Sequence, residues 1–205
     1  MKKVIRNSIL IVIILGIALA YSFGIWGKNI YVQTASSGDN QFTNELTGDI
    51  ELAQTFLCPY SGLNSIKVKM LRVGNENVEG YSWQVSDKEG RIVANGVIGE
   101  DQLTERAFTK KKFLTLEIPE QKNSKGMEYT LTITGTDVKK EGCLQAYITE
   151  GNQYAKELTL NGQQMDSSMV LKMNIRRFNV ETFLVFWGLV AYVWVFFKFM
   201  YKLFK

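Results

Sequence analysis

Two long apolar runs, one near each end of the chain, constrain the fold more than any other feature. The first covers residues 8–26 and contains no charged side chain; the second covers residues 182–204, with charges only at Lys198 and Lys202. A helix of about 20 apolar residues crosses the roughly 30 Å of a bilayer's hydrocarbon core. The sequence therefore predicts one transmembrane helix over residues 8–26 and another over residues 179–204.

Basic residues flank both runs on their outer sides. Three lie within the first seven residues, and Lys205 follows the second run. Because cytoplasmic flanks carry an excess of Lys and Arg, we expect both termini to be cytoplasmic. The predicted protein crosses the cytoplasmic membrane twice, with a cytoplasmic N-terminus at residues 1–7, an extracytoplasmic domain at residues 27–178 and a short basic cytoplasmic end.

A cleaved signal peptide is the competing interpretation of the first run. Its basic start, its apolar stretch and the Ala-Leu-Ala of residues 18–20 fit the pattern of a cleavage site. The run nevertheless continues to an aromatic residue, Trp26, which favours an uncleaved anchor of full length. Both interpretations place the central region outside the cytoplasm.

Small residues in the two runs are candidate helix-packing positions. Gly16, Ala20 and Gly24 recur every four residues, and Gly188 lies in the second run. Small side chains at this spacing let helices approach closely, although they are also common in membrane helices without a packing role. The two helices could pair with each other or with a membrane-protein partner.

The central region offers little for catalysis or nucleic-acid binding. The chain has no histidine, which removes the commonest general base and metal ligand. Residues 27–178 carry a net charge of −1, and the basic run at residues 110–112 is typical of a solvated turn. Neighbouring carboxylates such as Glu100 and Asp101 would point apart on a strand, unlike a glycosidase pair. We therefore predict a protein that is not an enzyme and has no nucleic-acid partner.

Apolar and polar residues alternate through most of the central region, as in half-buried strands. Turn residues separate these segments, and no stretch shows helical spacing. The pattern predicts an all-β, jelly-roll-like two-sheet sandwich. Trp83 shares a strand face with Tyr81 and Val85, which predicts a core position. The expected strands cover residues 30–32, 50–57, 66–70, 81–86, 91–98, 114–118, 129–134, 144–149, 156–160 and 169–175.

Several of these segments resemble a known exported module. It is the jelly-roll, carbohydrate-binding-module-like domain of bacterial membrane proteins of cell-surface polysaccharide assembly, including membrane glycosyltransferases. The resemblance implies a fold and a setting, and the lack of an attached catalytic domain implies an accessory role. Its segments are Ile50 to Phe56 (IELAQTF), Gly62 to Ile66 (GLNSI), Trp83 to Gly90 (WQVSDKEG), Phe113 to Pro119 (FLTLEIP), Ser124 to Tyr129 (SKGMEY), Leu158 to Gly162 (LTLNG) and Met169 to Met173 (MVLKM).

Three tyrosines are the candidate ligand-binding residues, because sandwiches of this kind hold sugars by stacking aromatic rings on pyranose rings. Tyr147 alternates with buried positions and should point outward. Tyr60 and Tyr154 fall in predicted turns. Lone surface tyrosines are also normal on proteins that bind no sugar, so the pattern alone does not predict an aromatic cluster.

Two further groups of residues are weaker candidates. Cys58 and Cys143 are the two cysteines and could form one disulfide, depending on whether the fold brings their Cα atoms together. Asp39, Asp49 and Glu51 could hold a structural Ca²⁺, but their spacing matches no defined calcium loop. We therefore predict no cofactor and no metal.

These observations give two function hypotheses. The first is a non-catalytic, membrane-anchored accessory protein whose extracytoplasmic domain binds a glycan or a protein partner in the assembly or export of cell-envelope polysaccharide. The alternative is a structural subunit whose transmembrane helices dock onto a polytopic membrane enzyme or transporter. An enzyme acting on surface glycans would need a cleft with converging carboxylates.

Overall fold

The computed structural model describes residues 2–33 and 41–204, without the side chains of residues 2–8, 10 and 107. The chain forms two compact units. The helical unit consists of Met1–Trp26 and Arg176–Lys205, and the sandwich unit consists of Gly27–Ile175. The boundaries lie close to those expected from the sequence at residues 27 and 178.

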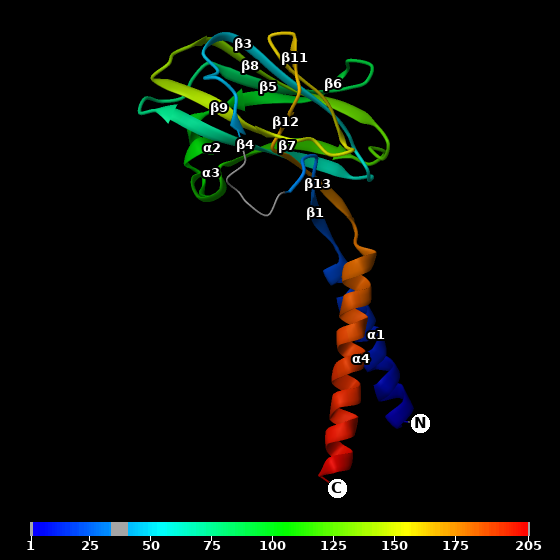
Figure 1. Cartoon of the computed structure of the whole chain (residues 1–205). Helices are drawn as coiled ribbons and strands as arrows, with labels where there is room; N and C mark the ends of the chain where they lie inside the picture. Colours follow the sequence, from blue (N-terminus) through cyan, green and yellow to red (C-terminus); the bar gives the residue numbers. More distant parts are fainter. Residues whose placement is uncertain (1, 34–40, 205) are drawn as a thin grey trace. The chain divides into compact units, whose positions relative to one another are not determined.

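The helical unit contains the two long helices, α1 (Lys2–Ser22) and α4 (Val180–Leu203). They lie side by side, and the rings of Tyr21 and Phe186 approach to 6.3 Å between centroids (Figure 1). Asn179 caps α4, because its side-chain oxygen accepts a hydrogen bond from the backbone N–H of Thr182 at 3.1 Å.

The two helices differ in their capacity to cross a membrane. Within the described chain, one helix is long and apolar enough to do so, Val180–Leu203. Among the described residues, the apolar part of α1 is Ile11–Ser22. This segment is shorter than the roughly 20 residues that a span requires.

The predicted helix over residues 8–26 is wrong at its C-terminal end. The helix stops at Ser22, and β1 (Phe23–Asn29) begins at the next residue. Glycines at positions 24 and 27 weaken a helix, while the aromatic and β-branched residues between them favour a strand. The N-terminal helix therefore ends four residues earlier than predicted, which weakens the argument from length for an uncleaved anchor.

Two antiparallel sheets form the sandwich, as the alternation predicts (Figure 1). The six-stranded sheet has the order β11-β10-β3-β8-β5-β6. The seven-stranded sheet has the order β1-β13-β4-β9-β12, with β7 also paired to β4 and β2 to β9. The strands are β2 (Gln41–Phe42), β3 (Gly48–Leu57), β4 (Leu63–Gly74), β5 (Tyr81–Asp87), β6 (Ile92–Ile98), β7 (Phe113–Gln121), β8 (Glu128–Val138), β9 (Gly142–Thr149), β10 (Ala155–Leu160), β11 (Gln163–Met165), β12 (Ser168–Met169) and β13 (Leu171–Phe178).

The core lies between the two sheets and is filled by alternate residues of the strands. On β4, Ile66, Val68 and Met70 are fully buried, whereas the lysines between them point outward. Trp83 is 6% exposed, which confirms its predicted core position. The period of two thus assigns the inner face of the main strands correctly.

Two short helices were not expected. α2 (Glu100–Thr104) and α3 (Arg106–Lys111) join β6 to β7 and bury Leu103 and Phe108. The basic run at residues 110–112 ends α3 instead of forming a turn between strands, and Lys112 takes a left-handed conformation with φ of 59°. Each helix is shorter than two turns, so neither produces a readable helical period.

Residues 30–32 also differ from expectation. Ile30 is fully buried, but it lies just beyond β1, and Tyr31 forms a single bridge with Gly151 in place of a strand. The backbone N–H of Ile30 still donates to the carbonyl of Leu171 at 3.1 Å. The apolar pattern therefore identified a buried segment and misjudged its extent.

Candidate functional site

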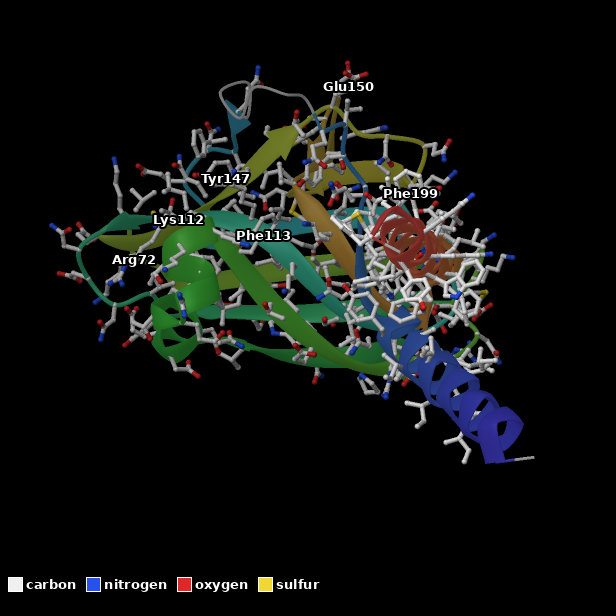
Figure 2. The ribbon with its side chains drawn as sticks, turned by 90° about the horizontal axis from the view of Figure 1, so that it is seen from below. Arg72, Lys112, Phe113, Tyr147, Glu150 and Phe199 are labelled. Carbon is white, nitrogen blue, oxygen red and sulfur yellow. The ribbon has the colours of Figure 1, made fainter. Side chains whose placement is uncertain are left out.

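The outer face of the seven-stranded sheet carries a group of basic and aromatic side chains. Lys67 and Lys69 of β4 point outward between the buried residues of that strand. Phe113 on β7 and Tyr147 on β9 are half-buried on the same side of the sheet, which Figure 2 shows with both residues labelled. We call this group the lysine–aromatic face; it consists of Phe42, Lys67, Lys69, Phe113, Tyr147 and Lys172.

One row of this face crosses four strands. Lys69 is the register partner of Phe113, and Phe42 is the register partner of Tyr147. The ammonium group of Lys69 lies 4.3 Å from the ring centroid of Tyr147. The rings of Phe42 and Tyr147 are 4.5 Å apart at an angle of 53°. The row therefore runs Phe113, Lys69, Tyr147, Phe42, from β7 to β2.

The neighbouring row places two lysines beside each other. Lys67 on β4 is the register partner of both Lys172 on β13 and Thr115 on β7. The ammonium group of Lys172 lies 5.5 Å from the ring centroid of Phe113. A Cβ at Gly27 would lie 2.8 Å from Cδ of Lys172, so the glycine leaves room for the lysine stem against the backbone of β1.

The face is positively charged. Burial lowers the pKa of Lys172, and the neighbouring charges of Lys67 and Lys111 lower it further. No ion pair of the described chain includes a lysine of this face. Glu117 is the carboxylate closest to it in register, opposite Ser65 on β4.

The three candidate tyrosines do not share one surface. Tyr147 belongs to the lysine–aromatic face and points outward as predicted. Tyr60 and Tyr154 instead pack against the core near the end of β3, where the backbone N–H of Leu57 donates to the carbonyl of Tyr154 at 2.8 Å. Lys28 lies over the ring of Tyr154, with 5.3 Å from its ammonium group to the centroid.

The candidate disulfide between Cys58 and Cys143 is wrong, because both thiols are free and fully buried. Cys58 directly follows β3, whose last residue pairs with the first residue of β8. Cys143 lies at the start of β9, beyond the last residue of β8, which pairs with the first residue of β3. The length of β3 separates these two ends of the sandwich by about 30 Å, far beyond bonding range. Burial raises the pKa of both thiols.

The predicted helix-packing face is also wrong in part. Gly24 lies in β1 instead of α1, and Ala20 is exposed. A Cβ at Gly16 or Gly188 would meet nothing within 4 Å. Among the described side chains of α1, the buried ones are Ala18 and Ser22, which have the same four-residue spacing two positions further along the helix.

The calcium candidates do not converge among the described residues. Asp39 lies outside them. A side-chain oxygen of Asp49 accepts a hydrogen bond from the backbone N–H of Asp137 at 3.2 Å, and the backbone N–H of Glu51 donates to the side chain of Asn161 at 2.8 Å. The part of the chain that the structure describes contains no group of three His, Cys, Asp or Glu residues suited to a metal ion.

Sequence reasoning missed most of the lysine–aromatic face. The alternation of Lys67 and Lys69 with buried residues predicts two outward lysines, but it does not reveal their neighbours. The neighbours come from β2, β7, β9 and β13, and their positions follow from strand register.

Comparison with models of known protein families and with curated proteins finds no match. The chain is thus defined by its fold, an all-β sandwich joined to a helical unit, and by this surface.

Proposed function

We propose that the chain is a non-catalytic accessory protein of the bacterial cell envelope. Its jelly-roll-like sandwich lies outside the cytoplasmic membrane and binds a glycan or a protein partner in polysaccharide assembly or export. α4, and α1 as a second span, anchor it with both termini in the cytoplasm. The ligand binds at the lysine–aromatic face.

The observation that carries this proposal is the row formed by Phe113, Lys69, Tyr147 and Phe42 across four strands. Aromatic rings supply large contact areas at little conformational cost, and lysine adds charge-assisted hydrogen bonds. A row on a sheet is held rigid by the backbone pairing beneath it, which suits recognition of an extended ligand.

The fold supports the jelly-roll interpretation. Sheet neighbours such as β3 with β8 and β4 with β13 are far apart in the chain, as in sandwiches with Greek-key connections. The seven segments that resemble carbohydrate-binding modules coincide mainly with strands of this sandwich and their turns.

A glycan array tests the proposal with the full-length chain in phosphatidylcholine nanodiscs. We expect wild-type protein to retain at least one class of envelope glycan, and the Phe42→Ala/Tyr147→Ala variant to bind it at least tenfold more weakly. The control Ile92→Ala/Val97→Ala removes two exposed apolar side chains of β6 and should bind normally. A blank array, together with no protein co-purifying from native membranes, would contradict the proposal.

The alternative function, docking of the helical unit onto a polytopic membrane protein, has its own supporting observation. A groove within this unit is lined by Ile17, Tyr21, Val185 and Phe186 of the two helices. Trp26 also lines it, and the indole nitrogen of this residue is buried without a hydrogen-bond partner. A helix of a partner protein could fill the groove and accept this hydrogen bond.

Leucine substitutions separate the two functions. Gly16 and Gly188 have free space around them, so Gly16→Leu and Gly188→Leu should leave the helical unit folded. Loss of a co-purifying membrane protein with glycan binding intact would support docking. Unchanged co-purification would argue against docking through these helix faces.

A further inference from the structure

We infer that the lysine–aromatic face recognises an anionic polysaccharide, with negative charges carried along a chain of pyranose rings. This inference rests on the proposed function, because it names the ligand class of the same surface. Three lysines and three aromatic rings contribute to the recognition. The lysines bind the charges, and the rings contact the sugar faces.

The lysines are arranged at a cost to the folded protein. Lys67 and Lys172 are register partners on neighbouring strands, and like charges directly opposite each other destabilise a sheet. Lys111 adds a third positive charge close to Lys172. Since no described ion pair offsets these charges, an anionic ligand is the complementary occupant.

The positions of the ammonium groups favour a charged glycan over a neutral one. Lys69 covers the ring of Tyr147, and Lys172 lies near the ring of Phe113. A neutral sugar would have to displace both cations from the rings without replacing that attraction. The carboxylate of an acidic sugar would instead attract the ammonium group away from the aromatic ring. The aromatic ring would then be free to stack on the sugar.

The shape of the aromatic row favours a polymer chain over an anionic bilayer. Phe113 and Tyr147 are half-buried, and Tyr147 packs against Phe42 at 4.5 Å. Side chains that insert into a membrane interface instead form a strongly apolar face that penetrates the headgroups. Four neighbouring strands spread the row over about 14 Å, which is an extended platform.

A pair of glycans that differ only in charge tests the inference. The probes are an oligogalacturonate and the same oligosaccharide with its carboxylates methyl-esterified, titrated calorimetrically into the full-length chain in phosphatidylcholine nanodiscs. We expect the charged form to bind at least tenfold more tightly than the ester. That preference should shrink as salt is raised, because dissolved ions screen the attraction between the partly buried lysines and the carboxylates.

Lysine variants connect this preference to the face. Lys67→Gln/Lys172→Gln should lower the affinity for oligogalacturonate at least tenfold, to about that of the ester. The control Lys88→Gln/Lys125→Gln removes two exposed lysines in turns of the same unit and should keep the preference. Circular dichroism checks that each variant remains folded.

Each other outcome overturns the inference in a different way. Equal affinity for both oligosaccharides, lost in Phe42→Ala/Tyr147→Ala, would reject the anionic ligand and leave glycan binding standing. Binding that survives Lys67→Gln/Lys172→Gln would reject this face as the site. Absence of binding to either probe also rejects the inference, and the glycan array then decides the proposed function separately. Binding to phosphatidylglycerol nanodiscs alone, dependent on Lys67 and Lys172, would make the surface a membrane contact.

Discussion

Single polar side chains connect the two sheets of the sandwich. Gln54, fully buried on β3, accepts hydrogen bonds from the hydroxyl of Ser168 at 3.0 Å and from the backbone N–H of Met169 at 2.8 Å. Its amide nitrogen donates to the carbonyl of Glu157 at 3.0 Å. A buried polar group in a core is tolerable only when it is hydrogen-bonded. Both the oxygen and the nitrogen of the Gln54 amide meet that condition.

We expect Gln54→Leu to destabilise the sandwich by about 1–3 kcal/mol, because the backbone N–H of Met169 would stay buried without an acceptor. Thermal or urea unfolding of the full-length protein in detergent measures the change. Gln84→Leu is the matched control, since Gln84 is partly exposed on β5 and should tolerate leucine within about 0.5 kcal/mol. Equal stability of the two variants would show that the sheets do not depend on this residue.

Tyr81 makes a second connection of this kind. Its hydroxyl donates to the carbonyl of Leu46 and accepts from the backbone N–H of Leu144 at 3.0 Å. Burial raises the pKa of Tyr81 to about 12. Because this pKa lies above the value of about 10 for an unfolded tyrosine, the protonated hydroxyl stabilises the fold below pH 10, and this contribution is lost as the pH rises toward 12.

Tyr81→Phe should therefore be less stable than wild type by about 1–3 kcal/mol at pH 8, with two backbone groups left unpaired. The difference between the two proteins should narrow between pH 10 and pH 12, because phenylalanine does not ionise. Unfolding curves recorded at several pH values measure it. A difference that stays constant above pH 10 would contradict the role given to the buried hydroxyl.

At the scale of elements, alternation along the chain predicted most of the sandwich. β3, β4, β5, β7, β8 and β9 each expose one face to the core, so their sequences carry the period directly. Residues 23–26, the first four of β1, are predicted as helix, because a short apolar segment suits both structures. The helices α2 and α3 were too short to leave a periodic signal.

The lysine–aromatic face could not be predicted in the same way. Alternation shows which side of a strand is buried, but pairing decides which side chains become neighbours. Phe42 and Tyr147 are far apart in the sequence and meet through the register of β2 with β9. Lys172 likewise meets Lys67 through the pairing of β13 with β4. Long-range register of this kind is not readable from one sequence.

The pairing of β5 with β6 depends on a close approach at Gly96. This glycine is the register partner of Trp83, and a Cβ there would lie 2.8 Å from the indole nitrogen. We expect Gly96→Val to displace the indole and destabilise the protein by about 1–3 kcal/mol. Tryptophan fluorescence and near-ultraviolet circular dichroism should both change.

Asn95→Val is the control on the same strand. Asn95 is exposed on the outer side of β6, so valine there should leave the spectra and the stability nearly unchanged. If Gly96→Val also left the indole signal unchanged, the close contact between Trp83 and β6 would not contribute to the packing of this sheet.

At the scale of the whole molecule, the strand β1 changes how the N-terminal segment can be interpreted. A cleavage after Ala20 would remove nearly all of α1 but would leave β1 attached to the sandwich. The two-pass anchor and the cleaved signal peptide are therefore both compatible with an intact sheet. They differ in the first residue of the mature chain and in the number of helices that hold it.

We expect the two-pass protein, and one experiment on protoplasts tests it. Trypsin added outside should cut the sandwich unit at exposed lysines such as Lys88 and Lys125, while α4, whose length and composition allow it to cross the bilayer, stays with the membrane. Mass spectrometry of the untreated protein should find a chain that still contains α1. A chain starting at Tyr21 would replace the two-pass anchor with a single span, and resistance of the sandwich until the protoplasts are permeabilised would place it in the cytoplasm. The second result would also remove the proposed function, because an envelope glycan could not reach the lysine–aromatic face.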